Sequence, residues 1–279
     1  MKRCLPLLLL IAACATTPAP NSSLRVMTYN IRLNLASDGP NAWPHRKDAV
    51  AGLVRDQSID LLGVQEALPE QLADLDAQLP RLGRFGEGRT AERLGEFTAI
   101  YFRRDRFDVL DAGTFWLSET PEVPGSRGWD AAYERIVTWG KLRDRQSGTT
   151  FFHFNTHFDH VGRIARRESA RLLVSRITSL AGSSPVIVTG DFNDLPEGEP
   201  YAIITGSGLS DAMLSARAAH RGPSSTWNAF KAIEPGRRID FIFTRGFDVT
   251  SHAILPGMID GTRFPSDHLP VVAEVRIGD

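Results

Sequence analysis

Six segments of this 279-residue chain place a carboxylate, an amide or an imidazole at the end or the start of an apolar, strand-like run. Each is weak evidence alone, because a polar residue beside a strand is usually a turn or a helix cap. Six in one chain are hard to explain by chance, and a single shared site would explain all of them. The residues concerned are Asn30, Glu66, His157 with Asp159, Asp191 with Asn193, Asp240, and Asp267 with His268.

The types of these residues point to a particular metal and reaction. Carboxylate and amide oxygens without cysteine suit Mg²⁺ or Mn²⁺ better than Zn²⁺. The only cysteines, Cys4 and Cys14, lie near the N-terminus, which excludes a Cys-rich zinc site. The sequence also lacks the zinc-protease, dinucleotide-binding, P-loop and α/β-hydrolase motifs. A hard dication combined with histidine acid/base chemistry suits phosphoester hydrolysis.

The elements that must position these residues are mostly strands. Alternating or apolar runs predict strands at 24–30, 59–64, 97–102, 141–142, 151–155, 185–189, 239–244 and 271–275. Helices are expected to open at Trp43-Pro44 and to cover residues near 69–79 and 164–180. Segments 113–135 and 215–238 are expected to be long irregular loops, which are often functional. Many strands with few helices predict an α+β sandwich with helices covering packed sheets.

The N-terminus resembles an export signal. Lys2 and Arg3 precede a short apolar stretch, residues 5–13, which is far below the ~20 residues needed to span a bilayer. The sequence Ile11-Ala12-Ala13-Cys14 resembles the bacterial lipobox, which implies cleavage before Cys14 and acylation of its thiol. The alternative is an ordinary signal peptide cut nearby. We therefore expect a signal peptide at 1–13, a lipidated cysteine and flexible tether at 14–23, and one domain at 24–279.

This reading predicts an exported protein of the cell envelope. The lipid on Cys14 would anchor it to a bacterial membrane, the outer membrane being expected, with the domain facing the periplasm or the surface as a monomer. Cleavage removes Lys2 and Arg3 and no acid, so the mature chain has 30 basic and 33 acidic residues and a net charge of −3. That balance argues against binding long nucleic acids by bulk electrostatics.

The motifs taken together resemble the endonuclease/exonuclease/phosphatase superfamily, which includes DNase I-like nucleases, inositol polyphosphate 5-phosphatases and bacterial sphingomyelinases. The resemblance covers residues 24–276 and implies the DNase I-like fold, a four-layer α/β/β/α sandwich of two mixed sheets. Two further segments resemble a bacterial subgroup whose substrates are poorly defined. The matching segments are Tyr29-Asn30-Ile31-Arg32, Gln65-Glu66, Asn155 to His160, Gly190-Asp191-Phe192-Asn193, Arg238-Ile239-Asp240 and Ser266 to Pro270, and the subgroup segments are Trp43 to Arg46 and Phe115 to Ala132.

The resemblance implies roles for the metal site and for the base. Glu66 is expected to be the principal ligand of Mg²⁺ or Mn²⁺, with Asn30 nearby and Asp267 contributing. His268 is expected to be the general base, oriented and made more basic by Asp240.

The remaining catalytic roles concern the phosphate. His157 is expected to donate to a non-bridging phosphate oxygen. Asp191 and Asn193 are expected to position the phosphate, the water or the leaving oxygen, in a division that the sequence leaves open.

Other candidates contact the substrate or shape the pocket. Arg32 is expected to bind a phosphate or to pair with a core carboxylate. Asn155 is expected to brace His157 beside the phosphate, and Asp159 to shape the rim of the pocket. Trp129, in a Gly-rich loop, is the candidate for stacking on a substrate, the alternative being loop packing.

The prediction is a divalent-metal-dependent phosphodiesterase, with a nuclease or a 3′–5′ exonuclease as the leading kind. The alternative substrates are a phospholipid, a sphingolipid or a sugar phosphate at the cell envelope. The alternative of a different class is a catalytically silent lipoprotein that binds carbohydrate or a protein partner.

Overall fold

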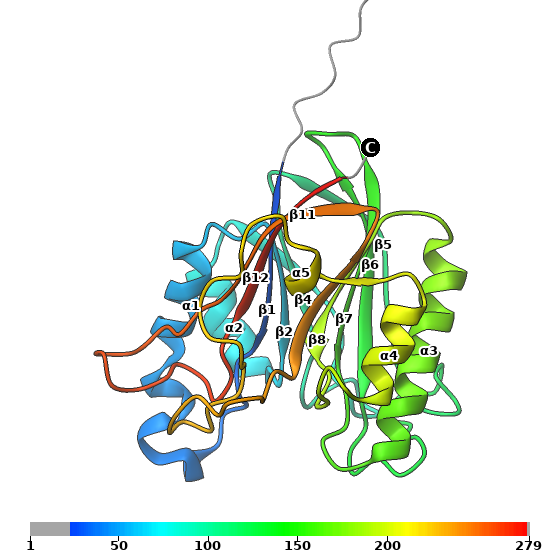
Figure 1. Cartoon of the computed structure of the whole chain (residues 1–279). Helices are drawn as coiled ribbons and strands as arrows, with labels where there is room; N and C mark the ends of the chain where they lie inside the picture. The colour runs from blue at the N-terminus through cyan, green and yellow to red at the C-terminus, as the bar shows by residue number, and fades with distance from the viewer. Residues whose placement is uncertain (1–22, 278–279) are drawn as a thin grey trace, which may run out of the picture.

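The computed structural model describes residues 23–277 and contains two six-stranded sheets packed face to face (Figure 1). The strand order is β11-β12-β1-β2-β4-β3 in the first sheet and β5-β6-β7-β8-β10-β9 in the second. Helices α1 and α2 cover the outer face of the first sheet, and α3 and α4 cover that of the second. The predicted four-layer α/β/β/α sandwich of mixed sheets is confirmed. The signal peptide and nearly all of the tether lie outside the described residues.

The bounds of the elements are as follows. The first sheet contains β1 (Leu24–Asn30), β2 (Leu61–Gln65), β3 (Leu82–Phe85), β4 (Ile100–Arg103), β11 (Phe247–Ile254) and β12 (Val271–Ile277). The second contains β5 (Phe107–Trp116), β6 (Ile136–Asp144), β7 (Thr150–His157), β8 (Val186–Asp191), β9 (Ser210–Asp211) and β10 (Asp240–Arg245). The helices are α1 (Lys47–Asp56), α2 (Pro69–Gln78), α3 (Arg163–Ala181), α4 (Glu199–Gly206) and α5 (Ala212–Ser215), with 3-10 turns η1 (Ala36–Asn41) and η2 (Trp43–His45).

The eight strands predicted from the sequence are the eight central strands of the two sheets. The four that the sequence did not predict, β3, β5, β9 and β11, are the four edge strands. An edge strand has a neighbour on one side only and buries less surface, so its hydrophobic pattern is weaker. In β5, for example, the four residues 109–112 have no buried member, which hides the strand from pattern analysis.

Two expectations about local structure are corrected. The helix expected to open at Trp43-Pro44 begins at Lys47, because residues 43–45 form the separate 3-10 turn η2. The segment 113–135 is not irregular throughout, since Gly113 to Trp116 complete β5. The rest of that segment is a long loop that reaches the start of β6.

Hydrogen bonds from Asn155 join the two sheets through their core. Asn155 lies on β7 of the second sheet, and its Nδ2 donates to the carbonyl oxygens of Val64 and Ala99 in the first sheet layer, at 2.8 and 3.1 Å. Gln65 of β2 donates back to its Oδ1 at 2.7 Å. The sheets approach closely here because β2 carries a glycine, Gly63, at which a Cβ would lie 2.3 Å from the hydroxyl oxygen of Thr189. The contact therefore fixes how the two sheets align.

The alignment brings the strand ends that carry the candidate site residues to one edge of the sandwich. Strands β1 and β2 pair in parallel, as do β7 and β8, so their C-terminal ends lie at the same edge. Strand β10 runs antiparallel to β8, which places its first residue, Asp240, opposite the last residue of β8, Asp191. Strand β12 is antiparallel to β1, so the loop before it, with His268, reaches the same edge.

Among residues 23–277, no helix has the length and the apolar character needed to cross a bilayer.

One buried histidine makes the stability of this fold depend on pH. His153 of β7 is fully buried, and burial lowers its pKa to about 3 from the usual value near 6.5. Between those values the unfolded chain binds a proton that the folded protein does not, so stability falls as the pH drops below about 6.5. The wild type loses free energy of unfolding between pH 7 and pH 5. We predict that this loss is about 2 kcal/mol smaller in His153→Leu.

The measurement is urea unfolding of both proteins at pH 7 and pH 5. The control is His45→Leu at an exposed position, which should leave the wild-type pH dependence intact. Equal losses in the wild type and in His153→Leu would contradict the prediction.

Candidate active site

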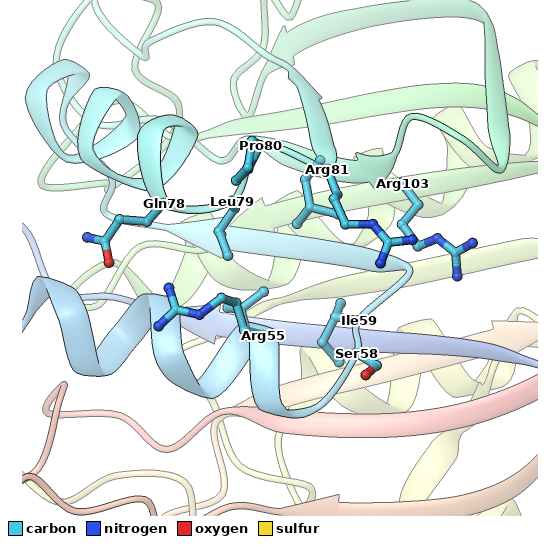
Figure 2. Close-up of a pocket in the computed structure, with 10 residues that line it drawn as sticks. Arg55, Ser58, Ile59, Gln78, Leu79, Pro80, Arg81 and Arg103 are labelled. Atoms are coloured by element: carbon cyan, nitrogen blue, oxygen red, sulfur yellow. The ribbon is translucent and has the colours of Figure 1, made fainter.

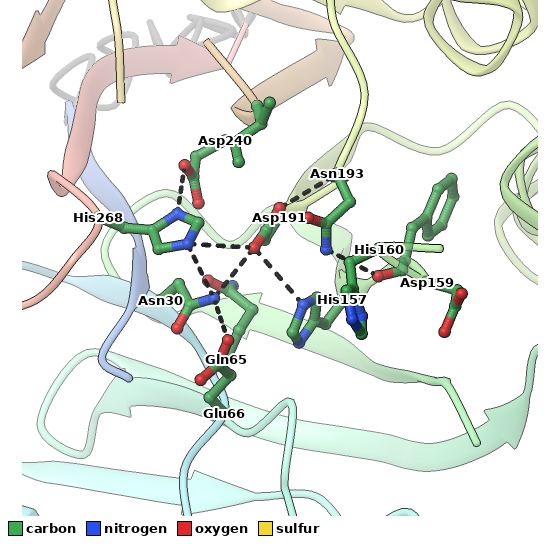
Figure 3. A network of polar contacts seen from close by, with 12 residues as sticks. Asn30, Gln65, Glu66, His157, Asp159, His160, Asp191, Asn193, Asp240 and His268 are labelled. Atoms are coloured by element: carbon green, nitrogen blue, oxygen red, sulfur yellow. Dashed lines mark hydrogen bonds and ion pairs between the residues drawn. The ribbon is translucent and has the colours of Figure 1, made fainter. Parts of the chain in front are cut away.

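A cleft of about 500 Å³ opens at the edge where the functional strand ends meet (Figure 3). The five residues predicted to be catalytic lie together at this edge, four lining the cleft and Asp240 directly behind His268. The predicted metal ligands Glu66 and Asp267 line it as well. The lining residues are Arg32, Leu33, Leu35, Glu66, Arg89, Glu96, Tyr133, Arg135, His157, His160, Asp191, Asn193, Trp227, Asp267 and His268.

His268 is held by a carboxylate behind it and faces another in front. Its Nδ1 lies 2.9 Å from Oδ2 of Asp240, and its Nε2 lies 3.6 Å from Oδ2 of Asp191. Burial alone would lower the pKa of His268, but the charges of Asp240 and Asp191 raise it to about 10. The ring of Trp227 meets the imidazole edge to face, with the centroids 4.7 Å apart. The arrangement is an oriented and strongly basic imidazole with one nitrogen toward the cleft.

Asn30 connects the two sheets at the base of the cleft. Its Nδ2 donates to Oε1 of Glu66 and to Oδ2 of Asp191, both at 3.0 Å, while its Oδ1 accepts from the backbone N–H of Arg32. In this orientation Asn30 presents its nitrogen, and not its oxygen, to the two carboxylates. That Asn30 lies near a bound metal stays a prediction. Its hydrogen bonds add a second role, because they bridge Glu66 and Asp191.

The carboxylates of Glu66 and Asp267 face one guanidinium. Nη1 of Arg32 lies 4.0 Å from Oε2 of Glu66 and 3.9 Å from Oδ2 of Asp267, while Asp38 holds the same side chain at 3.0 Å. Burial raises the pKa of Asp267, and the neighbouring charge of Glu66 raises it further. Burial opposes ionisation of Glu66 too, but the hydrogen bond from Asn30 and the charge of His268 outweigh it and lower its pKa. Arg32 therefore pairs with carboxylates, one of the two alternatives expected from the sequence.

Two places in the cleft offer ligands for a metal ion. Asp191, Asp240 and His268 each place a ligand atom within 4.8 Å of the others, so this buried cluster could bind a metal. An ion there would compete with the hydrogen bond between His268 and Asp240. The second place lies between Glu66 and Asp267, where Nη1 of Arg32 already lies within 4.0 Å of both carboxylates. Oxygen ligands of this kind fit Mg²⁺ or Mn²⁺.

Arg135 determines the form of His157. Nη1 of Arg135 lies 3.0 Å from Nδ1 of His157, and a guanidinium can only donate, so that nitrogen is an unprotonated acceptor. The proton of the neutral ring therefore sits on Nε2, which points toward Asp191 at 3.5 Å. Burial and the charge of Arg135 both hold the pKa of His157 well below its usual value. His157 is a fixed neutral hydrogen-bond donor, not a base.

Asp191 and Asn193 lie side by side at the end of β8. The backbone N–H of Asn193 donates to Oδ1 of Asp191 at 2.9 Å, and its side-chain nitrogen donates to the carbonyl of Phe158. Burial raises the pKa of Asp191 to about 7, and the charge of Asp240 adds to the rise. Asn193 has a positive φ of 49°, as do Glu66 and Arg32 at 61° and 55°. Such backbone is uncommon outside glycine and often marks functional sites.

Three residues predicted to contact the substrate or shape the pocket do not line the cleft. Asn155 is fully buried in the hydrogen bonds that join the sheets, so it cannot reach a substrate. Asp159 is buried and does not line the cleft itself, but it accepts from Tyr133 and Arg135, which do, so its predicted role in shaping the rim stays a prediction. Burial opposes ionisation of Asp159, but the backbone N–H groups around it outweigh that effect and lower its pKa to about 2. Trp129 does not line the cleft, so the geometry does not support its stacking role.

Several lining residues were missed by sequence reasoning. Arg135 and Tyr133 end the long loop before β6, and Arg89 follows β3, positions that no motif marks. Glu96 lines the cleft too and pairs with Arg89 at 2.7 Å. Trp227 meets His268, although Trp129 was the favoured tryptophan. Length and irregularity of the loops were the only signals available for Tyr133, Arg135 and Trp227.

A second cavity of about 480 Å³ lies between the C-terminal ends of α1 and α2 (Figure 2). Its lining combines apolar side chains with the arginines Arg55, Arg81 and Arg103, and it contains no Asp, Glu or His. Arg81 and Arg103 are already paired with Asp105. The acid/base residues all lie in the other cleft, which is therefore the candidate active site.

Comparison with known proteins agrees with this geometry. The model of the Endonuclease/Exonuclease/phosphatase family matches residues 27–268. A solved endonuclease/exonuclease/phosphatase from Bacteroides vulgatus is 38% identical with a TM-score of 0.87, and the match covers 92% of this chain and 99% of that one. A mannosyl-6-phosphatase from Bacteroides thetaiotaomicron is 36% identical with a TM-score of 0.84, covering 90% and 99% of the two chains.

A curated relative matches a smaller part of the chain. The uncharacterized protein L388 of Acanthamoeba polyphaga mimivirus is 28% identical over 160 residues, which are 54% of this chain. The match spans 59% of that relative, less than two thirds of its length.

The contact of Arg135 with His157 makes a prediction about protonation. Replacing Arg135 with Met removes a positive charge and the donor to Nδ1, so we expect the pKa of His157 to rise and the Nε2–H tautomer to lose its dominance. Long-range ¹H–¹⁵N NMR of the imidazoles during a pH titration measures both. Arg127→Met in the neighbouring exposed loop is the control. An unchanged tautomer and pKa would show that Arg135 does not hold the ring.

Proposed function

Because this chain belongs to the endonuclease/exonuclease/phosphatase family, whose members are hydrolases acting on phosphoesters, we propose that it is a divalent-metal-dependent phosphoester hydrolase. The observation that carries the proposal is the buried pair of His268 and Asp240. The pair lies 2.9 Å apart and directs a basic nitrogen into a cleft lined by carboxylates and by a second, neutral histidine. Burial of charge at this cost is typical of acid/base sites.

The metal in this proposal is Mg²⁺ or Mn²⁺, held by Glu66 and Asp267 near Asn30. Bound there, the dication would neutralise charge on the phosphate and favour ionisation of the attacking water. The facing carboxylates and their contact with Arg32 support this assignment over the Asp191, Asp240 and His268 cluster. His268 stays free for proton transfer in this arrangement, and Arg32 is near enough to contact a bound phosphate.

The protein's own residues divide the remaining work. Because the charges of Asp240 and Asp191 raise the pKa of His268, the ring is a base only in its unprotonated form, which the charge of a bound dication would favour. In that form Nε2 removes the proton of the attacking water, and Asp240 stabilises the imidazolium that forms. His157 donates its Nε2–H to a non-bridging oxygen of the phosphate as negative charge develops there. Asp191 lies between these two histidines with Asn193 beside it, and the two residues position the water or the leaving oxygen.

The substrate we propose is a phosphorylated sugar. The similarity to the mannosyl-6-phosphatase extends over 90% of this chain at 36% identity, which supports a related substrate. The cleft holds about 500 Å³, a volume suited to a small molecule. Each arginine that lines it already has an acidic partner, Asp38 for Arg32, Glu96 for Arg89 and Asp159 for Arg135. A nucleic acid, the leading sequence-based prediction, would be favoured by free cations along a groove.

The proposed lipid anchor is compatible with this site. Strand β1 begins at Leu24, next to the predicted tether, and ends at Asn30 in the cleft. The seven residues of β1 are extended, so Leu24 and Asn30 lie roughly 20 Å apart. An enzyme held through Cys14 would therefore be attached at the end of β1 that lies away from the cleft. Export, lipidation and envelope location remain proposals from the sequence.

The test of this function is turnover of phosphoesters by purified protein and by His268→Ala. We expect hydrolysis that EDTA abolishes and that Mg²⁺ or Mn²⁺ restores, and we expect His268→Ala to lower kcat by about 10²–10⁴-fold. The panel contains mannose 6-phosphate, p-nitrophenyl phosphate, bis-p-nitrophenyl phosphate and a single-stranded oligonucleotide. His45→Ala, at an exposed position outside the cleft, is the control and should retain full activity.

Two results would contradict the proposal. Metal-stimulated turnover unchanged in His268→Ala would remove His268 as the base. No turnover of any substrate, together with no metal binding by calorimetry, would favour the silent binding lipoprotein. Preferential cleavage of the oligonucleotide would retain the hydrolase and reject the sugar phosphate.

A further inference from the structure

One wall of the cleft has no part in the chemistry proposed above. Arg89, Tyr133 and His160 lie against one another there, with the Arg89 guanidinium 5.1 Å from the centre of the Tyr133 ring. The rings of Tyr133 and His160 are stacked at 5.8 Å with 18° between their planes. Glu96 holds Arg89 at 2.7 Å, and Arg135 holds His160 at 3.1 Å. We call these four residues, Arg89, Glu96, Tyr133 and His160, the outer wall.

The outer wall offers both a donor and an acceptor to the cleft. Arg135 donates to Nδ1 of His160, so the neutral ring carries its proton on Nε2, which has no partner among residues 23–277. One oxygen of Glu96 forms an ion pair with Arg89, and within the described chain the other has no hydrogen-bond partner. The hydroxyl of Tyr133, whose side chain is 49% exposed, is likewise unpaired among these residues.

The charge of the outer wall selects the kind of group it can bind. The positive charge of Arg89 is balanced by Glu96, and that of Arg135 by Asp159. A second phosphate would need an unpaired cation, and an acyl chain would need an apolar surface, neither of which this wall provides. A ring bearing several hydroxyls needs donors and acceptors beside planar groups without an excess of charge, and the outer wall provides them.

We propose that the outer wall is the leaving-group subsite, in which Glu96, Tyr133 and His160 bind the hydroxyls of a sugar ring. The inference rests on the proposed function, because it needs the phosphate of the same molecule to lie between Glu66 and His268. Arg135 is then a positioning residue for both halves of the cleft, since it contacts His157 of the chemical site and His160 of the outer wall. Selectivity among phosphomonoesters depends on these side chains and not on the metal site.

The test compares two substrates that share a phosphate and differ in the leaving group. Mannose 6-phosphate carries sugar hydroxyls, and p-nitrophenyl phosphate carries none. Glu96→Gln weakens a charged acceptor, and Tyr133→Phe removes one hydroxyl while it keeps the ring. We expect KM for mannose 6-phosphate to rise about 10-fold in Glu96→Gln and about 3-fold in Tyr133→Phe, with kcat nearly constant. The ratio of kcat/KM between the two substrates should fall by the same factors.

A binding measurement and a matched control complete the design. Free mannose should inhibit hydrolysis of p-nitrophenyl phosphate competitively, and its inhibition constant should rise in both variants. Glu92→Gln in the same loop, where the side chain is exposed and does not line the cleft, should leave the ratio unchanged. Tyr133→Phe retains the fold because the change is confined to a half-exposed hydroxyl, so it remains informative if Glu96→Gln misfolds.

The possible outcomes separate this inference from the proposed function. A selective rise in KM for mannose 6-phosphate supports the subsite. An equal loss on both substrates, or no loss on either, overturns it. Turnover of p-nitrophenyl phosphate that depends on His268, without hydrolysis of mannose 6-phosphate or glucose 6-phosphate, would reject the sugar subsite and leave the phosphoesterase standing. Absence of any turnover would reject the proposed function itself.

Discussion

The amide of Asn30 lies where the two sheets meet at the cleft, and the site depends on its two hydrogen bonds. It donates at 3.0 Å to Glu66 in the first sheet layer and to Asp191 in the second. Both acceptors are carboxylates at the edge of a dry core, where an unpaired charge would be costly. The amide separates them and gives each a partner. The contact requires that β1 and β8 end at the same depth, which the closely packed Gly63 and Asn155 ensure deeper in the sandwich.

The cleft holds more negatively charged side chains than the packing of the two sheets requires. Glu66, Asp191, Asp240 and Asp267 are placed around one cavity, and the cations nearest to them are Arg32 and the imidazolium of His268. Opposite shifts of pKa follow, upward for Asp191 and His268 and downward for Glu66. Groups whose environments push their pKa values apart are typical of acid/base sites. The excess charge is a stability cost that a bound dication would offset.

The two halves of the cleft differ in electrostatic character. The half with Glu66 and His268 is strongly charged and buried, whereas the outer wall pairs its arginine, Arg89, with Glu96, and the adjoining Arg135 pairs with Asp159. Arg135 belongs to both halves, because its guanidinium contacts His157, His160 and Asp159. In the proposed function, chemistry and selectivity share Arg135 as a positioning residue but depend on different side chains, so they can change separately.

The local pattern of the chain was sufficient to predict the eight central strands, because a strand buried between neighbours needs a run of apolar residues. It also predicted the polar residues at the strand ends, since Asn30, Glu66, Asp191 and His268 follow or precede such runs directly. Edge strands were not predictable in this way, because they bury too little to impose a pattern.

Only the tertiary structure decided which of those polar residues reach the cleft. Asn155 and His157 point the same way along β7, yet the first sheet covers Asn155 and leaves His157 at the rim. The partners of Asp159 and the whole outer wall come from loops without a motif. Contacts such as that of Asn30 with Asp191 join residues 161 positions apart. Such contacts depend on how the two sheets pack. The hydrophobic periodicity of a single segment carries no information about which distant segment will lie against it.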